Sequence, residues 1–416
     1  MNQMKLVVIG GGAAGFFCAV NAARLYPGAQ VTILEKSGKL LSKVKVSGGG
    51  RCNVTHACFS MAEMLKKYPR GASFLKKAFH HFFTTDTVAW FEERHVGLKT
   101  EGDGRMFPST DSSQSIINCL LQEADKYKVE ILMNADVKEI RQQAAKGFEL
   151  ILATKTIYAD KVCIACGGYP KASGFDWLEK LGHSYELPVP SLFTFNMPGN
   201  SITTLMGITV ENVTVKIAGT KLQQEGPLLI THWGMSGPAI LKLSAWAARD
   251  LEQKNYAFTA IVNWLPAFNE NSLKEKLLQV RFDLAAQKIV NRNPFGLPSR
   301  LWEYLLINCG ISVDLRWADL PAKEQNKLVK ILCSHEFAVK GKTTFKEEFV
   351  TAGGIRTSEI DVNTMQSKIV PGLFFAGEVI DVDGVTGGFN FQNAWTTGWI
   401  AAKGFADAGT GAMNGG

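Results

Sequence analysis

The chain has 416 residues, which suggests two or three domains at about 150 residues each. Hydrophobic residues make up 46% and charged residues 20%, a balance that is typical of globular proteins and excludes a disordered chain. Forty-five Lys and Arg against 38 Asp and Glu leave a net charge of +7. This excess permits an anionic cofactor or substrate, but it is too diffuse to indicate a nucleic-acid partner.

Eight cysteines are spread along the chain, at positions 18, 52, 58, 119, 163, 166, 309 and 333. The first apolar run leads straight into a glycine-rich turn and does not resemble a signal peptide. No apolar stretch reaches the ~20 residues that cross a bilayer. We therefore expect reduced thiols in a cytoplasmic protein that has no membrane partner, and the sequence does not predict an oligomeric state.

The first forty residues predict one βαβ unit. Lys5–Ile9 is a short apolar run that ends at glycine, as a buried parallel strand does. An alanine-rich helix follows over Phe16–Leu25, and Pro27-Gly28 ends it. Gln30–Glu35 is predicted as a second strand that ends in a carboxylate.

Periodicity also predicts the elements of the middle of the chain. Ser113–Tyr127 has helical spacing, Val129–Ile140 resembles a pair of strand-like turns, and Phe148–Thr154 adjoins a strand over Lys155–Ile164. Between about 191 and 264 the segments are short and β-like, and from 272 to 340 the pattern is helical. The clearest of these segments are Thr209–Ile217 and Ala257–Val262 for strands, and Ser272–Val290 and Ala322–Cys333 for helices.

The last seventy residues return to strands and glycine turns. These strands are predicted at Phe349–Gly354 and Gly372–Glu378. A closing helix runs from about Phe391 to Ala408.

The glycines at 10, 12 and 15 match the G-x-G-x-x-G pattern of dinucleotide-binding turns. Gly10 allows the tight turn, Gly12 lets the backbone approach a pyrophosphate, and Gly15 lets the helix pack close to the strand. The start of the helix supplies free amides for the phosphates. Glu35, twenty residues after the last glycine, is placed to accept hydrogen bonds from a ribose. The alternative is a tight turn without a ligand.

This motif does not separate NAD from FAD, but the C-terminal region favours FAD. Gly372–Glu378, followed by Asp381 and Asp383, places carboxylates at the end of a late strand. The segment from Thr386 to Ala394 then leads into a helix, whose N-terminus would stabilise negative charge on a reduced flavin.

Together these features predict an α/β fold, with a discontinuous Rossmann-type FAD-binding domain and an inserted β-rich plus helical domain. We expect residues 1–190 and 346–416 to form the FAD-binding domain. Residues 191–345 form the insert, which is β-rich over 191–264 and helical over 265–345.

The chain resembles flavoproteins of the glutathione-reductase type with two dinucleotide-binding domains, and more closely the bacterial BaiN/YhiN-like family, which includes aminoacetone oxidases and bile-acid reductases. The segments that carry this resemblance are Val7–Gly15, Val46–Thr55, Thr231–Pro238 and Val350–Ala402. The resemblance implies bound FAD, an inserted domain over the flavin and redox activity on a small molecule. It does not fix the substrate, and it implies that Val137 touches the adenine.

The segment Ser47–Asn53 has its own physical basis as a cofactor loop. Its three glycines allow close approach of the backbone, and Arg51 brings a permanent cation to phosphates or to a flavin carbonyl. The alternative is a tight loop with a solvent-facing arginine. The predicted cofactor-binding residues in all are Gly10, Gly12, Ala13, Ala14, Gly15, Glu35, Lys36, Lys43, Gly50, Arg51, Cys52, Asn53, Val137, Ala165, Gly167, Gly377, Glu378, Asp381, Gly388, Asn390, Phe391 and Gln392.

Two cysteine pairs could carry redox chemistry. Cys52 and Cys58 are separated by five residues, whereas the disulfide reductases use four, so packing of Cys52 competes with a catalytic role. Cys163 and Cys166 straddle the end of an apolar strand and lack two further ligands for zinc, so we predict no metal and a turn that contacts FAD through Ala165 and Gly167.

His232 is the other catalytic candidate, because its titration range suits proton transfer to a substrate. A structural histidine is the competing interpretation. Trp233 beside it either lines an apolar substrate cavity or packs within the insert.

No second strand–G-x-G-x-x-G–helix unit occurs, so we expect no dedicated NAD(P) domain. The favoured function is an FAD-dependent oxidoreductase acting on a small molecule, reduced by transient NAD(P)H. One alternative is an amine-type oxidase that is reduced by its substrate and uses O₂. Flavin-dependent tRNA modification and a flavin sensor without turnover also remain open. Acidic residues interleave with the basic ones at 274–292, so no nucleic-acid partner is expected.

Overall fold

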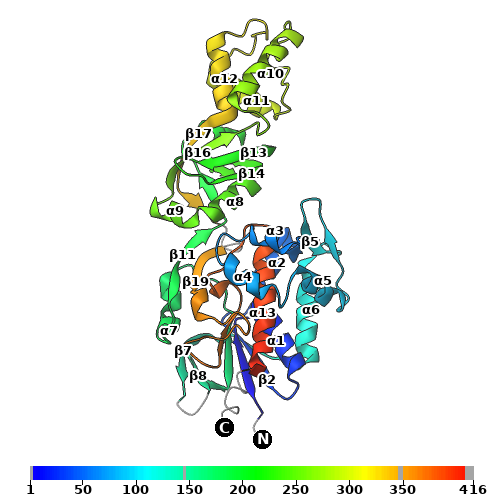
Figure 1. Ribbon diagram of the computed structural model, residues 1–416, viewed down its shortest axis with the longest axis vertical. Helices are drawn as coiled ribbons and strands as arrows, with labels where there is room; N and C mark the ends of the chain where they lie inside the picture. Colours follow the sequence, from blue (N-terminus) through cyan, green and yellow to red (C-terminus); the bar gives the residue numbers. More distant parts are fainter. Residues whose placement is uncertain (1–2, 144–146, 345–349, 408–416) are drawn as a thin grey trace. The chain divides into compact units, whose positions relative to one another are not determined.

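The computed structural model describes residues 3–143, 147–344 and 350–407. The chain divides into two compact units. Unit 1 comprises Met1–Pro190 and Lys346–Gly416, and unit 2 comprises Ser191–Phe345. Figure 1 shows the elements of each unit.

The centre of unit 1 is a parallel sheet with strand order β20-β10-β1-β2-β6. β1 has four buried residues in succession, as expected for a strand covered on both faces. Because the strands are parallel, their carboxyl ends share one edge of the sheet. The strands are β1 (Lys5–Ile9), β2 (Gln30–Glu35), β6 (Glu130–Met133), β10 (Lys161–Ile164) and β20 (Leu373–Phe375).

Helices α1 (Ala13–Leu25) and α13 (Phe389–Asp407) lie side by side against this sheet, although they come from opposite ends of the chain (Figure 1). Ten residues of α1, Ala14 to Ala23, are buried. Small residues permit the close approach of α13 and of η4 to α1. A Cβ on Gly398 would lie 2.8 Å from the carbonyl oxygen of Ala14, and one on Gly377 would lie 2.7 Å from the Ala14 Cβ.

The other elements of unit 1 surround this core. Its smaller sheets are β3-β5-β4, β7-β8-β9 and β11-β19. Their strands are β3 (Thr55–His56), β4 (Leu98–Thr100), β5 (Arg105–Pro108), β7 (Val137–Gln142), β8 (Phe148–Leu152), β9 (Thr156–Ala159), β11 (Tyr185–Ser191) and β19 (Val350–Ile355). The helices are α2 (Ser42–Gly50), α3 (Met61–Leu65), α4 (Ala72–Ala78), α5 (Thr84–Glu92), α6 (Ser113–Lys126), α7 (Asp176–Glu179), η1 (Ala172–Phe175), η3 (Thr357–Glu359) and η4 (Gly377–Val379).

Unit 2 combines an antiparallel sheet, of order β17-β16-β13-β14-β15-β12-β18, with helices. Its strands are β12 (Thr194–Asn196), β13 (Thr209–Ile217), β14 (Gln223–Thr231), β15 (Gly234–Ser236), β16 (Ala257–Asn263), β17 (His335–Lys340) and β18 (Lys342–Thr343). Its helices are η2 (Ser201–Leu205), α8 (Pro238–Trp246), α9 (Ala248–Gln253), α10 (Glu270–Asp283), α11 (Ser299–Cys309) and α12 (Ala322–Ser334).

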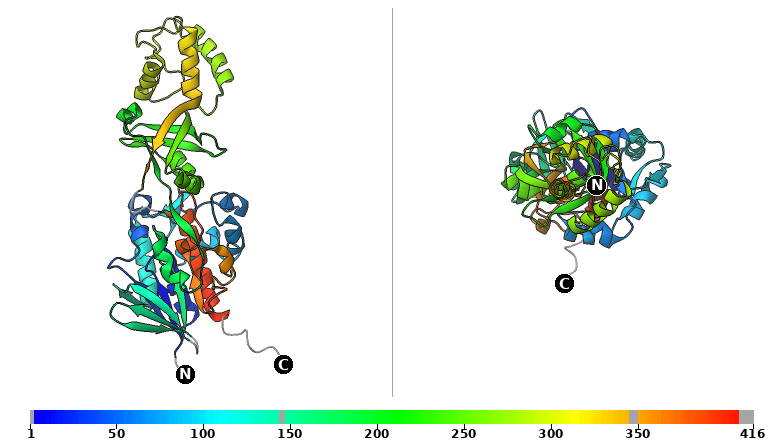
Figure 2. Two further views of the ribbon diagram at one scale, coloured as in Figure 1. Left: turned by 90° about the vertical axis from the view of Figure 1, so that its left-hand side faces the viewer. Right: turned by 90° about the horizontal axis from the view of Figure 1, so that it is seen from above.

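The α/β fold with a parallel sheet and an antiparallel β-rich insert agrees with the sequence prediction, but two predicted helical spans are wrong. The helix expected over Ser272–Val290 ends at Asp283, because the following residues pair with a distant segment: the amide of Ile289 donates to Leu315 and that of Trp317 to Gln287. The helical pattern expected to continue to residue 340 ends at Ser334, where α12 runs directly into β17 (Figure 2).

Other predictions are matched closely. β1, β2 and β13 have the predicted bounds. Val129–Ile140 resolves into β6 and β7. Phe349 and Ala408, predicted as ends of a strand and of the last helix, lie outside the described residues.

His335 is a half-buried titratable group that packs against the core residues Trp264 and Phe337 of unit 2. Its Nδ1 accepts a hydrogen bond from the indole nitrogen of Trp264 (3.2 Å), a residue that is only 1% exposed. Burial lowers the pKa of His335 to about 4. The folded chain therefore holds this imidazole neutral, with Nδ1 as an acceptor.

We predict that unit 2 loses stability in acid through His335. Between pH 6.5 and about 4 the unfolded chain binds a proton that the folded chain does not, so the free energy of unfolding falls by roughly 1.4 kcal/mol per pH unit. Urea unfolding of wild type and His335→Gln, followed by tryptophan fluorescence from pH 7.5 to 4, measures this slope. The exposed His80→Gln is the control. Equal slopes in wild type and His335→Gln would contradict the prediction.

Candidate functional site

The glycine turn after β1 brings α1 against the carboxyl edge of the parallel sheet. Gly10 has a φ of +117°, and a Cβ there would lie 2.4 Å from the carbonyl oxygen of Ala165. A Cβ on Gly15 would lie 1.9 Å from the carbonyl oxygen of Gly10. Neither position can hold a side chain without moving the backbone, as the sequence pattern predicted.

Gly12 differs from its neighbours, because a Cβ there would meet no atom within 4 Å. It is the N-cap of α1, and no side chain caps the helix or places an acidic group in its first turn. The amides of the first turn, including those of Ala13 and Ala14, thus have no competing anion. This arrangement suits a phosphate.

Glu35 lies beside this turn, at the end of β2. Its Oε2 accepts a hydrogen bond from the amide of Gly11 (2.9 Å), and its Oε1 accepts from the amide and the hydroxyl of Ser37 (2.9 and 2.7 Å). The carboxylate is half-buried and oriented, as a ribose-binding group requires. Lys36 next to it is exposed.

A second glycine loop follows, inside α2. Ser47 is extended, and Gly48, Gly49 and Gly50 have left-handed φ values of +59°, +70° and +85°. A Cβ on Gly48 would strike the ring of Phe107 at 2.7 Å, whereas at Gly49 and Gly50 it would meet open space. Two successive open glycines leave bare backbone for a ligand.

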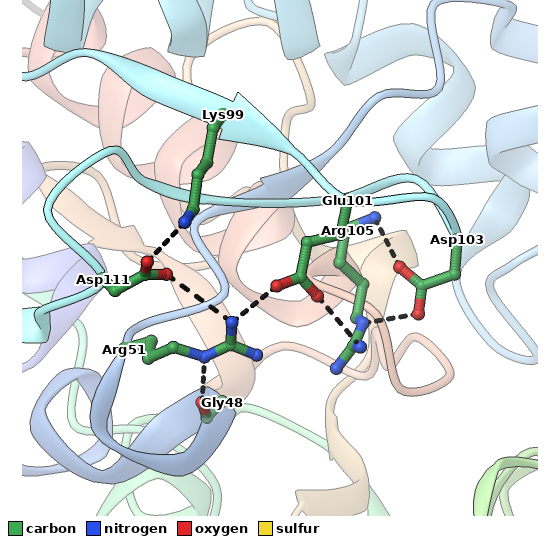
Figure 3. Close-up of polar contacts among 7 residues, drawn as sticks. All are labelled: Gly48, Arg51, Lys99, Glu101, Asp103, Arg105 and Asp111. Carbon is green, nitrogen blue, oxygen red and sulfur yellow. Dashed lines mark hydrogen bonds and ion pairs between the residues drawn. The ribbon is translucent and has the colours of Figure 1, made fainter.

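Arg51 lies in a network of charged groups rather than alone (Figure 3). Its Nη1 donates to Glu101 Oε1 at 2.5 Å and lies 3.6 Å from Asp111 Oδ1. Its guanidinium also stacks over the ring of Phe107, 4.0 Å from the centroid. The cofactor contact predicted for Arg51 stays a prediction, since two carboxylates already balance its charge and raise its pKa, chiefly through the Glu101 hydrogen bond.

Cys52 is fully buried, and its left-handed φ of +63° turns the chain after the glycines. Burial raises the pKa of its thiol to about 12. Cys58 is partly exposed, and burial raises its pKa as well. All eight cysteines are free thiols. These properties favour packing for Cys52 over the redox role proposed as its alternative.

The segment after Cys52 is fixed to the start of α13. With its side-chain amide oriented to satisfy its hydrogen bonds, Asn53 accepts from the amide of Gly388 and donates to the carbonyl of Thr55, both at 3.0 Å. Thr55 Oγ1 donates to Gln392 Oε1 at 2.6 Å. The predicted residues Asn53, Gly388 and Gln392 therefore belong to one arrangement, although Gln392 is fully buried within it.

The loop before α13 is held by an ion pair between Arg70 and Asp383, and Asp383 is fully buried. Asn390 closes the loop: its Oδ1 accepts from the amide of Gly384 (2.8 Å) and its Nδ2 donates to that residue's carbonyl (2.9 Å). Phe391 stacks on Trp395 at a centroid distance of 5.7 Å. The start of α13 is thus a rigid platform.

Lys43 and Glu378 form an ion pair (2.6 Å) that joins α2 to η4. Glu378 Oε1 also accepts from the amide of Thr351 (2.9 Å). The hydroxyl of Thr351 is buried and has no hydrogen-bond partner among the described residues. Sequence reasoning missed Thr351, although its place in the Thr-Ala-Gly-Gly end of a strand was a signal.

The remaining predicted residues of unit 1 differ in how deeply they are buried. Ala165 is buried, and its amide donates to the carbonyl of Ile9 (2.8 Å). Gly167 has a φ of +77°, and a Cβ there would lie 3.9 Å from Glu378. Val137 opens β7 and is half-buried. The amide of Asp381 donates to Ile355 (2.9 Å).

His232 lies in unit 2, in an open pocket of about 280 Å³. Its exposed ring packs at right angles to Trp233, 4.2 Å between centroids, and the indole nitrogen of Trp233 donates to Thr194 Oγ1 (3.0 Å). The lining residues are Asn196, Met197, Pro198, Gly199, Thr203, His232, Trp233 and Lys340. The pocket combines aromatic and apolar walls with an amide, an imidazole and an ammonium group.

In the parts of the chain that the structure describes, no three His, Cys, Asp or Glu side chains gather in a way that could hold a metal ion. Over the same residues, no helix has both the length and the apolar character needed to span a bilayer.

The fold and the glycine turn define a Rossmann-type domain interrupted by an inserted unit, the architecture of FAD-binding oxidoreductases. A flavocytochrome c3 fumarate reductase in its open conformation has a similar fold, with a TM-score of 0.51 and 18% identity over 97% of this chain and 78% of that one.

The model of the HI0933-like protein Rossmann domain family matches residues 4–404, so the chain belongs to that family. It is 31% identical to a ribosomal RNA dihydrouridine synthase of Escherichia coli K12, over 97% of this chain and 98% of that protein. It is 27% identical to a 3-dehydro-bile acid delta(4,6)-reductase of Clostridium scindens, over 97% and 99%. The predicted class, a flavin-dependent oxidoreductase, is confirmed at this level.

We predict that the Cys52 thiol is inert in the native protein. With a pKa of about 12, its thiolate fraction at pH 8 is roughly 10⁻⁴, so alkylation should be more than 1,000-fold slower than for a free cysteine. Iodoacetamide labelling followed by peptide mass spectrometry measures the rate at each cysteine, and the partly exposed Cys58 is the internal control. Rapid labelling of Cys52 in folded protein would show that its burial is not maintained.

Proposed function

We propose that this protein is an FAD-dependent reductase that saturates a carbon–carbon double bond conjugated to a carbonyl, with uridine of ribosomal RNA as its substrate. The observation that carries the proposal is the 31% identity, over nearly the whole of both chains, to a ribosomal RNA dihydrouridine synthase. The small-molecule substrate expected from the sequence is the second candidate, because a bile-acid reductase is 27% identical over the same span.

The residues present fit FAD. Gly12 and the uncapped start of α1 offer bare backbone and free amides to a pyrophosphate, and Glu35 offers an oriented carboxylate to a ribose. Gly50 offers a second open stretch of backbone, and the buried hydroxyl of Thr351 has an unused hydrogen-bonding group. The rigid start of α13, held by Asn53 and Asn390, would face the negative charge of a reduced flavin.

The two relatives' names describe one kind of reaction. Dihydrouridine is uridine with its C5=C6 bond saturated, and that bond is conjugated to the C4 carbonyl. A 3-dehydro-bile acid with double bonds at positions 4 and 6 is likewise conjugated to its C3 ketone. Each reduction adds two electrons and two protons to the substrate, and bound FAD supplies two-electron chemistry of this type.

NADH or NADPH is the proposed source of the electrons, oxidised to NAD⁺ or NADP⁺ as the substrate is reduced. Within the described residues the chain forms one parallel sheet with one G-x-G-x-x-G turn, so the nicotinamide would dock transiently. His232, exposed in the pocket of unit 2, is the candidate to hand a proton to the substrate.

The direct test incubates the FAD-loaded protein with NADPH or NADH and unmodified 23S and 16S rRNA transcripts, then measures dihydrouridine by nucleoside mass spectrometry. We expect dihydrouridine at a discrete position, and we expect His232→Gln to lower turnover without changing flavin content. A parallel reaction contains a 3-oxo-Δ4,6 bile acid. If only the steroid is reduced, the substrate is the small molecule of the second candidate and not RNA. Bleaching of the flavin without any reduced product would contradict both candidate substrates.

A pair of glycine variants tests the cofactor site. Gly12→Ala meets no neighbour, so the apoprotein should unfold at the wild-type temperature while its FAD content falls, because the methyl group occupies the approach of a phosphate. Gly15→Ala places its Cβ 1.9 Å from a backbone oxygen and should destabilise the fold by about 1–3 kcal/mol or more. The ratio of absorbance at 450 and 280 nm and the thermal unfolding of the apoprotein separate the two effects. Full FAD content in Gly12→Ala would contradict the placement of the FAD pyrophosphate at Gly12.

A further inference from the structure

The helical part of unit 2 carries basic side chains that acidic groups do not neutralise. Residues 265–334 contain ten Lys and Arg against seven Asp and Glu. Among the described residues from 265 to 344, one of these basic side chains forms an ion pair: Lys288 with Asp314, at 2.7 Å. The other nine basic side chains therefore have no carboxylate of the described residues within 4.0 Å.

Unit 1 has more of its basic side chains in ion pairs and a smaller excess of them. Its arginines at 51, 70 and 94 are each paired with one or two carboxylates. It contains 28 Lys and Arg against 26 Asp and Glu, whereas unit 2 contains 17 against 12. Most of the net charge of +7 therefore belongs to the smaller unit, where the structure leaves it available to an external anion.

Three of these cations follow one face of α12. Lys323, Lys327 and Lys330 are spaced at i, i+4 and i+7 and are all exposed. Leu328, Val329 and Leu332, on the other side of the helix, are buried. Successive lysines on one helix face form a row of positive charge that suits the repeated phosphates of a nucleic-acid strand.

The neighbouring helix α10 exposes an aromatic ring. Phe282 is 83% exposed and Leu278, one turn before it, is 62% exposed, while Leu273, Leu277 and Val280 face the core. Such exposure of a phenylalanine costs hydration free energy unless a partner covers it.

Helices α10 and α12 pack on each other (Figure 1). Arg281 bridges them, because its Nη1 donates to Gln325 Oε1 and its Nη2 to the carbonyl of Ala318, both at 3.0 Å. Phe282 and the lysine row therefore lie on adjoining helices, each turned away from the buried face of its own helix. Proteins bind unpaired RNA with this combination of aromatic stacking and backbone cations.

We propose that α10 and α12 form an RNA-docking surface, in which Lys323, Lys327 and Lys330 contact phosphates and Phe282 stacks on an unpaired base. The inference rests on the proposed function for its choice of RNA over other polyanions. It assigns to the helical part of the insert a role in holding the substrate, apart from the chemistry. Three of the basic residues at 274–292, from which no nucleic-acid partner was expected, lie in α10: Lys274, Lys276 and Arg281.

Binding of the full-length, FAD-loaded protein to a fluorescein-labelled oligouridylate of about 20 nucleotides, measured by anisotropy over a range of NaCl concentrations, tests the charge row. The triple variant Lys323→Glu, Lys327→Glu, Lys330→Glu should bind at least tenfold more weakly and lower the slope of log K against log salt by about 2. A Lys→Gln triple variant, which adds no repulsion, should lower the slope in the same direction.

The matched control reverses the charge of three exposed lysines of unit 1, in the triple variant Lys155→Glu, Lys171→Glu, Lys180→Glu. It should leave the affinity for RNA within about twofold of wild type. Phe282→Ala should weaken binding by roughly tenfold with an unchanged salt slope, since stacking is not ionic. Tyr158→Ala, which removes a 54% exposed ring from unit 1, is its control. Circular dichroism and thermal unfolding verify that each variant is folded.

The outcomes separate this inference from the proposed function. Dihydrouridine formation by wild type together with wild-type affinity in both triple variants would overturn the docking surface and leave the function intact. Weaker binding in the triple variants, without dihydrouridine formation by wild type, would support the surface and contradict the function. Equal losses in the unit 1 control, or tighter binding to vesicles of anionic phospholipid than to RNA, would overturn the inference.

Discussion

The close approach of α1 to the backbone around it is the constraint on which unit 1 depends. Gly10 and Gly15 leave no space for a Cβ between the helix and the strand before it, and Gly377 in η4 and Gly398 in α13 leave none next to Ala14. Since α1 is buried along ten successive residues, it cannot shift to relieve a clash. The carboxyl edge of the sheet, Glu35 and the start of α13 keep their places because these four positions lack side chains.

The elements that sequence predicted well are those with local causes. Lys5–Ile9 and Gln30–Glu35 are bounded by glycine or a carboxylate and have the apolar runs of buried strands. The errors arise where a distant partner decides the conformation. The helix expected beyond Asp283 gives way to a segment whose carbonyls at Ile289 and Arg292 accept from the indoles of Trp302 and Trp317. No local pattern shows which tryptophans will be near.

The candidate site divides in the same way. The glycines and Glu35 were predictable because one motif contains them within twenty-six residues and each has a geometric reason. Arg51 is a cation beside a glycine loop, as predicted, but Glu101 and Asp111 approach it from the loops that flank β5, fifty and sixty residues along the chain. Its charge environment is a product of tertiary structure. The same holds for the buried amide of Gln392, which Thr55 and Thr87 bind.

The charge of unit 2 shows why interleaving along a sequence is a poor guide to charge in space. Glu324 follows Lys323 directly, yet consecutive residues of a helix point about 100° apart, so the two do not share a face. Lys323, Lys327 and Lys330 do share one, and although Glu324 lies one turn before Lys327, it makes no ion pair with any of the three among the described residues. A run that looks neutral when counted by neighbours thus becomes a basic face when wound at 3.6 residues per turn. An approaching polyanion responds to how charges are distributed over a surface, which the net charge of the chain does not give.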